Sequence, residues 1–323
     1  MNNNFLIAIL FISILSISCS SPTDNDTLSF LNEPFNVPVK DIVAFSARFE
    51  DNAGNLQWRL VLIDIHDRSH YKILNCDTVS VYGKKFSPGK DKILFNGEGS
   101  ISIYDAYPQF FIYDVRENTI LPLQRKDNGG YIDPINGAYP VWFNDESGFY
   151  FWSLGSSSTY YYKFPENNSF LLDMKDLHAR VIGIMEDNSI IAYNRDSGCH
   201  LFDDSGNYIR ILGSEHINDF SKNGIDFGEY GEYLNIDWHQ GAELFVYSGS
   251  KITVADMDSN VLREFEGTVN SDYCPVFGPD AENILFLRGS TGVIMHIDVE
   301  TGTVSDFLCP DDIGAVRIMS VDY

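Results

Sequence analysis

The sequence predicts an all-β fold, a ring of six blades that are each a sheet of four antiparallel strands. Three observations support this prediction. Short β-prone runs alternate with polar turns along most of the 323 residues, a ten-residue phrase recurs, and one apolar segment near residue 323 has no partner of its own. Repeats of about 40–50 residues with strand signals are typical of β-propeller blades.

The recurring phrase opens with a large apolar residue, passes through a polar turn and closes on a β-prone run. That order predicts a strand, a tight turn and a second strand, which we call the a–b corner of a blade. Its copies start 56, 42, 54 and 39 residues apart: FSPGKDKILF (86–95), WFNDESGFYF (142–151), IMEDNSIIAY (184–193), WHQGAELFVY (238–247) and FGPDAENILF (277–286). The Pro and Gly residues of these corners are expected to supply backbone angles, not catalytic groups.

Further strand pairs follow the corners and complete the blades with strands c and d. They read QFFIYDVRENTILPLQ (109–124), CHLFDDSGNYIRIL (199–212), KITVADMDSNVLREF (251–265) and VIMHIDVETGTVSDFL (293–308). Asp256 to Asn260 briefly resembles a calcium loop, but Val261 replaces the Gly of that motif, so a hairpin turn is expected.

An incomplete unit precedes the first phrase. DIVAFSARF (41–49), WRLVLIDI (58–65) and HYKIL (70–74) predict strands b, c and d, and no strand a precedes them. The unpartnered segment GAVRIMSVDY (314–323) is expected to supply it. This pairing would close the ring in blade one and leave no terminal blade with an open inner edge.

FSPGKDKILF and the hairpin HIDVETGTV (296–304) resemble the repeats of TolB-like six-bladed propellers and their WD-repeat-like relatives. Those repeats read F-S-P-D-G-K-x-I-x-F followed by I-Y-x-x-D-x-x-T-G. The resemblance covers roughly residues 41–323 and implies the propeller fold, although blades three to five lack the Ser-Pro pair. TolB also has an N-terminal α/β domain, for which the polar stretch before this propeller is too short. The resemblance therefore does not imply TolB's envelope partners.

The N-terminal residues predict export. Residues 5–17 form an uncharged apolar run, which is short for a spanning helix and typical of a signal-peptide core. The run leads into Ser18 and Cys19, which resembles a bacterial lipoprotein signal. We expect a signal peptide over 1–18, lipidation of Cys19, a flexible linker over 19–40 and a propeller over 41–323. An ordinary secretory signal and an uncleaved anchor are the alternatives. By resemblance to enterobacterial sorting, Ser20 favours the outer membrane, on its periplasmic or surface side.

The formal net charge is −24. Such a chain is a poor ligand for nucleic acid or for anionic membranes, so membrane contact is expected only through the lipid anchor. Cys76, Cys199, Cys274 and Cys309 remain after Cys19. They could pair in three ways, but isolated buried thiols are favoured. Their spacing and that of the histidines predict no metal site, and no cofactor is expected.

Three long predicted connections lie on one face of the ring, over 96–109, 125–140 and 213–233. Variable loops on a rigid scaffold commonly carry function. Aromatic rings with polar neighbours suit a sugar ring or a partner's apolar side chains. The predicted binding residues are Tyr104, Tyr107, Tyr131, Tyr139, His216, Phe227, Tyr230 and Tyr233. The alternative for any single tyrosine is that it packs its own loop onto the ring.

Taken together, these features favour a non-catalytic bacterial envelope lipoprotein that binds a protein or glycan partner through the long-loop face. No serine nucleophile elbow or Walker loop occurs in the sequence. A propeller-type polysaccharide lyase or glycoside hydrolase, with its site at the channel mouth, is the alternative. It would draw on loop carboxylates such as Asp133, Asp219 and Glu229. A purely structural spacer is the third reading.

Overall fold

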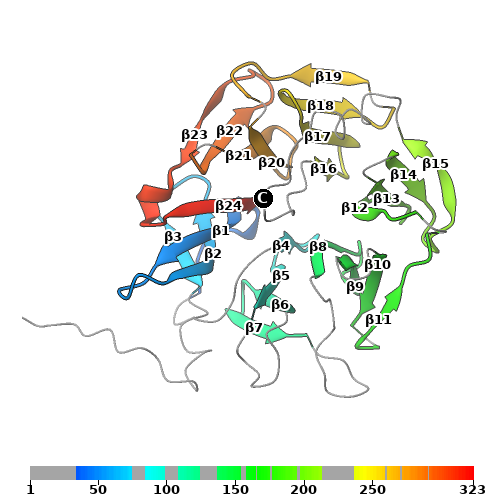
Figure 1. The fold of residues 1–323 in the computed structure, drawn as a ribbon, viewed down its shortest axis with the longest axis horizontal. Coiled ribbons are helices and arrows are strands. Elements are labelled where there is room, and N and C mark those ends of the chain that lie inside the picture. Colours follow the sequence, from blue (N-terminus) through cyan, green and yellow to red (C-terminus); the bar gives the residue numbers. More distant parts are fainter. Residues whose placement is uncertain are drawn as a thin grey trace, which may run out of the picture.

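The computed structural model describes residues 34–74, 84–98, 108–123, 137–153 and 158–323, with gaps at 165, 175–176, 195–196, 213–235, 259, 270 and 290. The described residues form six four-stranded antiparallel sheets arranged in a ring (Figure 1). This confirms the six-bladed β-propeller predicted from the sequence. No helix in these ranges has the length and apolarity to span a membrane.

The first three blades follow the chain order, apart from one strand. Blade one contains β24 (Arg317–Asp322), β1 (Ile42–Glu50), β2 (Leu56–Asp64) and β3 (Tyr71–Leu74). Blade two contains β4 (Lys84–Phe86), β5 (Lys92–Glu98), β6 (Pro108–Asp114) and β7 (Thr119–Pro122). Blade three contains β8 (Gly137–Trp142), β9 (Gly148–Ser153), β10 (Ser158–Lys163) and β11 (Asn168–Leu171).

The other three blades have the same a–b–c–d order. Blade four contains β12 (Arg180–Ile184), β13 (Ile190–Asn194), β14 (Gly198–Phe202) and β15 (Tyr208–Leu212). Blade five contains β16 (Ile236–His239), β17 (Leu244–Ser248), β18 (Ile252–Asp256) and β19 (Val261–Glu264). Blade six contains β20 (Asp272–Phe277), β21 (Asn283–Arg288), β22 (Val293–Asp298) and β23 (Val304–Leu308). Two short 3-10 segments, η1 (Val39–Asp41) and η2 (Pro310–Ile313), complete the elements.

Strand β24 closes the ring as predicted. It pairs antiparallel with β1, with Ala44 opposite Asp322 and Phe45 opposite Val321. The apolar side chains of β24 and β1 then enter the core between blades one and six, where Phe45, Ile318 and Leu285 are nearly or fully buried. Burying each such side chain contributes about 1.5–3 kcal/mol, so closure stabilises the neighbouring blade as well as blade one.

Apolar side chains between adjacent blades form the core. Leu94 and Phe110 of blade two pack with Trp142 and Phe149 of blade three, for example. The stretch before β1 also contributes to this packing. Phe35 and Val37 are buried in the cluster between blades one and two, with the Phe35 ring 4.8 Å from the His70 ring.

The a–b corners share one backbone device. Each described corner has a non-glycine residue in the left-handed region, namely Lys90, Glu146, Asn188, Glu243 and Ala281, with φ between 53° and 67°. In blade two the corner is closed by hydrogen bonds from Lys90 N to Ser87 O (2.8 Å) and from Ser87 N to Lys92 O (2.9 Å). The expectation that Gly supplies the special backbone angle is wrong here, because the positive φ falls on Lys90, one residue after Gly89.

The c–d turns use aspartate instead. The side chain of Asp256 accepts hydrogen bonds from the backbone N–H groups of Asp258 and Asn260, which confirms the hairpin turn expected there. Similar bonds to Asp114, Asp203 and Asp298 close the turns of blades two, four and six. Part of the chain's large negative charge therefore comes from aspartates that stabilise these turns.

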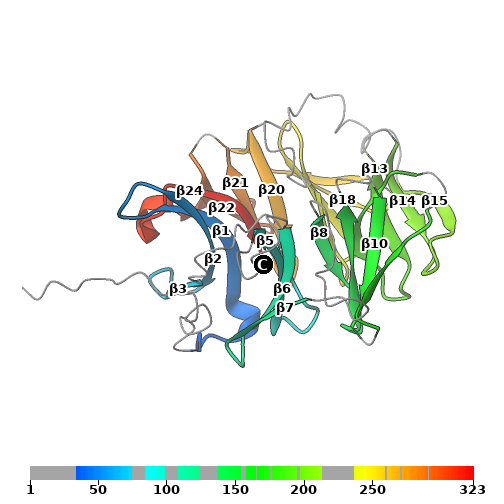
Figure 2. The same ribbon diagram turned by 60° about the horizontal axis from the view of Figure 1, so that its bottom comes forward.

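The strands run between the two faces of the ring, which the tilted view of Figure 2 makes visible. Because neighbouring strands are antiparallel, the a–b and c–d turns leave at one face, the turn face. The b–c and d–a connections leave at the other, the long-loop face. The longest intervals between described strands are β15 to β16 and β7 to β8, followed by β5 to β6 and β3 to β4, which are equally long, and all four belong to the long-loop face.

Candidate functional site

The predicted binding residues fall mostly outside the described part of the chain. Cys19, Tyr104, Tyr107, Tyr131, His216, Phe227, Tyr230 and Tyr233 all lie outside it. Only Tyr139 is described. It has a φ of 57° in β8 and is half-buried, with the guanidinium of Arg180 4.8 Å from the centre of its ring. Tyr139 thus packs against blade four, and the site as a set stays a prediction.

Sequence reasoning missed a group of charged side chains at the axis of the ring. The innermost strands β4, β8, β12, β16, β20 and β24 surround this axis (Figure 1). The residue just before the a–b corner in blades two to six has an equivalent in blade one, at the matching place near the end of β24. These residues are Lys85, Val141, Gly183, Asp237, Val276 and Asp322. Three of the six are charged, and the structure brings these three together.

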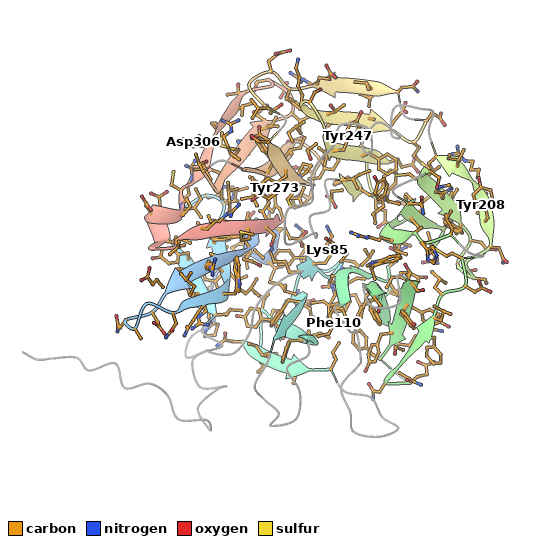
Figure 3. The ribbon with its side chains drawn as sticks, in the orientation of Figure 1. Lys85, Phe110, Tyr208, Tyr247, Tyr273 and Asp306 are labelled. Atoms are coloured by element: carbon orange, nitrogen blue, oxygen red, sulfur yellow. The ribbon has the colours of Figure 1, made fainter. Side chains whose placement is uncertain are left out.

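Lys85 is the centre of this axial cluster. Its ammonium lies 3.1 Å from Asp237 Oδ1 of blade five and 3.0 Å from Asp322 Oδ1 of blade one. Figure 3 places it close to the axis, whereas Tyr208 lies on the outer rim. Burial lowers the pKa of Lys85, but the two carboxylates outweigh that effect and hold its pKa above the ordinary value. Lys85 is therefore a permanent cation that joins three blades.

The two carboxylates also bind backbone groups of the next blade. Asp322 Oδ2 accepts a hydrogen bond from Phe86 N (2.8 Å), and Asp237 Oδ2 accepts one from Phe277 N (3.1 Å). Each aspartate thus links its own blade to the a–b corner of its neighbour and to Lys85. Bonds between charged groups and N–H donors contribute about 1.5–3 kcal/mol each, so the cluster fixes the spacing of blades around the axis.

Two more lysines of blade two reach the same region. Lys84 Nζ donates to Ser320 Oγ at 2.6 Å, and burial lowers the pKa of Lys84 to about 8. Lys90 extends back from its corner, and its ammonium lies 5.4 Å from the Phe86 ring centre and 4.8 Å from that of Tyr323. Burial also lowers the pKa of Lys90 to about 8.

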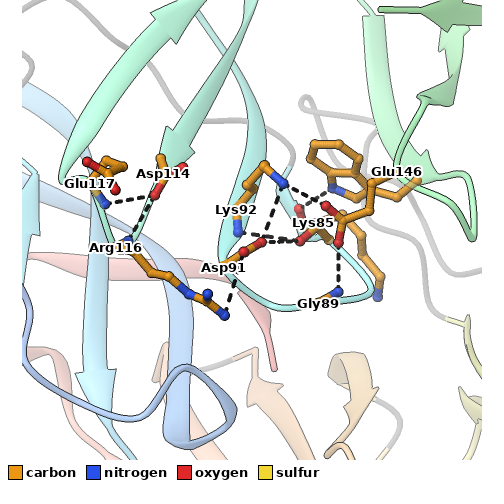
Figure 4. Close-up of polar contacts among 10 residues, drawn as sticks. Lys85, Gly89, Asp91, Lys92, Asp114, Arg116, Glu117 and Glu146 are labelled. Atoms are coloured by element: carbon orange, nitrogen blue, oxygen red, sulfur yellow. Dashed lines mark hydrogen bonds and ion pairs between the residues drawn. The ribbon is translucent and has the colours of Figure 1, made fainter.

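The turn face beside this cluster is held by a second, more exposed ion-pair network (Figure 4). Lys92 Nζ lies 2.7 Å from Glu146 Oε2, and Gly89 N donates to Glu146 Oε1 at 2.8 Å. A Cβ at Gly89 would lie 2.9 Å from that oxygen, which explains why glycine fits here. Burial raises the pKa of Glu146, but these bonds outweigh it and lower its pKa overall.

Other polar pairs in the described ranges are explained by the fold. Ser197 Oγ lies 2.8 Å from His200 Nε2, but the same hydroxyl donates to Asn194 Oδ1 and closes the b–c turn of blade four. A hydroxyl has one proton, so it cannot serve both acceptors as an activated nucleophile would require. No group of three His, Cys, Asp or Glu side chains in the described ranges could hold a metal ion.

A signal for the axial cluster was present in the sequence. KKFSPGKDK (84–92) carries four lysines in an otherwise acidic chain, and aspartate precedes the corner position in IDWHQ and SVDY. Aligning the residue before each corner would have placed Lys85, Asp237 and Asp322 in one layer. Sequence alone does not show that their side chains meet across the axis.

Comparison with known proteins supports the same fold. No protein-family model and no curated protein matches this chain. Among solved structures, TolB from Acinetobacter baumannii is similar, with a TM-score of 0.63, 12% identity and coverage of 87% of this chain and 66% of that one. A chain from the crystal structure of a Nidogen/Laminin complex has a TM-score of 0.60, 10% identity and coverage of 87% and 97%.

The putative TolB from Agrobacterium tumefaciens is also similar, with a TM-score of 0.53, 13% identity and coverage of 82% of this chain and 89% of that one. At these identities the similarity concerns the fold. The chain has a six-bladed β-propeller fold similar to that of these TolB structures, as the sequence resemblance implied. It spans 66% of the length of the A. baumannii protein.

Proposed function

We propose that this chain is a non-catalytic bacterial envelope lipoprotein, anchored through Cys19, whose propeller binds a partner at the long-loop face. The observation that carries the proposal is the asymmetry of the ring. Short hydrogen-bonded corners form one face, and the four longest intervals between described strands all belong to the other. Rigid scaffolds that present variable loops on one side are suited to recognition.

The partner is a protein or a glycan of the cell envelope. The aromatic residues of the long connections can stack on a sugar ring or receive a partner's apolar side chains. The Nidogen/Laminin complex supports a protein partner by analogy, because a chain with a similar fold is part of a complex between proteins there. The predicted export signal and the TolB-like fold support an envelope location, and the outer membrane remains our proposal for the anchor.

Site-specific photo-crosslinking in the native envelope tests this proposal. A photoreactive residue replaces Tyr131 or Tyr230 on the long-loop face, or Tyr208, which is 51% exposed on the outer strand β15. We expect a discrete crosslinked product from the first two positions and none from the third. The product's mass and its sensitivity to protease or glycosidase identify the partner class.

Alanine variants provide the second half of this test. Tyr131→Ala and Tyr230→Ala should weaken binding of the identified partner at least tenfold, whereas Tyr208→Ala should leave it unchanged. Equal crosslinking at all three positions, or full affinity in both loop variants, would contradict the proposed face. Unprocessed Cys19 in the mass spectrum of the mature protein would contradict the anchor.

A further inference from the structure

A surface patch of blade one combines arginines with exposed apolar residues at the long-loop face. We call it the blade-one patch, and it consists of Arg48 near the end of β1, Leu56 and Trp58 at the start of β2, and Val316 and Arg317 at the start of β24. Leu56 and Val316 are 42% and 54% exposed. The backbone N–H of Val316 donates to Arg48 O at 2.7 Å, which joins the two sides of the patch.

Arg48 lies at the centre of this patch. Strand pairing places it directly opposite Trp58 in β2 and opposite Arg317 in β24. Its guanidinium carbon lies 5.6 Å from the centre of the Trp58 ring, and its buried Nε has no hydrogen-bond partner among the residues that the structure describes. The two Nη groups also bond to no described residue and are not buried, so they face solvent beside the indole.

Two arginines at opposed positions are unexpected in a chain with 46 acidic and only 22 basic residues. Like charges directly opposite each other destabilise a sheet. Arg317 extends toward blade six, where a Cβ at Gly292 would lie 3.3 Å from its Cγ. This direction relieves the repulsion but gives neither arginine a carboxylate partner in the described part of the chain.

The carboxylates of this region are engaged elsewhere. Asp51 closes the β1–β2 turn by accepting hydrogen bonds from two backbone N–H groups of that turn. Asp272 is paired with Arg288, and Glu50 Oε1 lies over the tip of the turn, 3.6 Å from where a Cβ of Gly54 would be. The arrangement thus leaves a solvent-facing guanidinium on an indole ring, with apolar side chains beside it.

We propose that the blade-one patch binds a protein segment in which one Asp or Glu is flanked by apolar residues, with the Arg48 guanidinium holding the carboxylate. The planar guanidinium fork matches a carboxylate, and Arg and Trp are enriched among the residues that dominate binding energy at protein interfaces. A polyuronate carries a charge on every sugar and is repelled by a chain of net charge −24, whereas a segment with a single acidic residue is not. The inference rests on the partner-binding face proposed above and specifies what the partner presents to it.

Two matched peptide libraries test this inference on the full chain. Both display random segments of the same length, and the central residue is glutamate in one library and glutamine in the other. We expect the chain to enrich binders from the glutamate library only, because the amide offers no charge to the guanidinium. The enriched peptides should carry apolar residues next to the glutamate.

Variants locate the binding. Arg48→Met should weaken a selected peptide about tenfold or more, and Arg48→Lys, which keeps the charge but lacks the fork, should recover only part of that loss. Arg210→Met removes a cation from the outer strand β15, which is 48% exposed, and should leave binding unchanged. The urea midpoint of Arg48→Met should equal that of wild type, because the lost cation has no carboxylate partner. If Arg48→Met does not fold, Arg48→Lys and Arg210→Met still decide the question.

Equal enrichment from the two libraries, or peptides that bind Arg48→Met as tightly as wild type, overturns the inference. Tighter binding of an oligogalacturonate than of any selected peptide overturns the protein segment as the ligand. Photo-crosslinking at Tyr131 and Tyr230 is read separately. If it succeeds in wild type while the peptides fail, only the carboxylate site falls, and if it fails while peptides bind through Arg48, the function proposed for the long loops falls instead.

Discussion

Replacing Lys85 with methionine should expose how strongly the axial cluster holds the ring. Methionine keeps much of the length and the apolar stem of lysine but removes the cation. Asp237 and Asp322 would then keep only their backbone donors, with two carboxylates facing each other near the axis. Removing one member of a buried ion pair typically destabilises a protein by 3–5 kcal/mol.

The contacts and exposure of Lys85 allow a closer estimate of this loss of stability. Two charge-assisted bonds at about 1.5–3 kcal/mol each would be lost, but the Lys85 side chain is 31% exposed, which reduces their net value. We expect the free energy of unfolding to fall by about 3 kcal/mol. Lys92→Met is the matched control. Lys92 is 34% exposed and also meets two carboxylates, but those are 23% and 24% exposed, so its loss should cost about 1 kcal/mol.

Urea unfolding followed by tryptophan fluorescence measures both variants, and Trp142, whose indole donates to Lys85 O at 3.0 Å, reports on this region. The same substitution made in an Asp322→Asn background should cost at least about 1 kcal/mol less, because one of the facing charges is gone. Our reasoning is refuted if Lys85→Met costs no more than Lys92→Met, or if its cost is the same in both backgrounds.

Three further predictions follow from burial. The pKa of Lys84 is about 8 in the folded chain against an ordinary 10.5, so the unfolded chain binds more protons between these values. The stability of wild type relative to Lys84→Met should therefore rise by about 2 kcal/mol from pH 8 to pH 10, and a flat difference in urea titrations would contradict this. Gly148→Ala should cost about 3 kcal/mol in the same assay, because its Cβ would meet the carbonyl oxygen of Tyr162, whereas Gly249→Ala has open space around it and should be nearly neutral. Thiol labelling followed by mass spectrometry should modify half-buried Cys309 in the native protein but fully buried Cys199 only after unfolding, and early labelling of Cys199 would show that its blade opens locally.

The repeated phrase was sufficient to predict the blades. Short β-prone apolar runs on both sides of a polar turn favour paired strands, and five copies spaced 39 to 56 residues apart favour a ring of blades. The partner of Ile42–Glu50 was found by elimination, since Arg317–Asp322 had no other strand to pair with. The left-handed corner residues were not predicted, because Lys90 and Glu146 are unusual at positive φ.

The site was harder to predict than the fold for a physical reason. Lys85 and Asp237 are brought together only by the curvature of the whole ring, and no local pattern records that distance. The aromatic residues of the loops are easy to find in the sequence, but their role is difficult to predict. Their sequence pattern is visible, but the same tyrosine can bind a partner or pack its own loop, as Tyr139 does against Arg180.

The pairing of β24 with β1 also fixes the order in which the ring can be completed. The contact joins the two ends of the folded region, so it closes one of the longest possible loops and comes late in folding. Until residues 317–322 emerge from the ribosome, β1 has a bare inner edge that can pair with other chains. A chain stopped before residue 317 would hold five complete blades and one three-stranded sheet with an exposed, apolar edge. We therefore expect such a truncated chain to aggregate during folding, which no loss of a binding residue would reproduce.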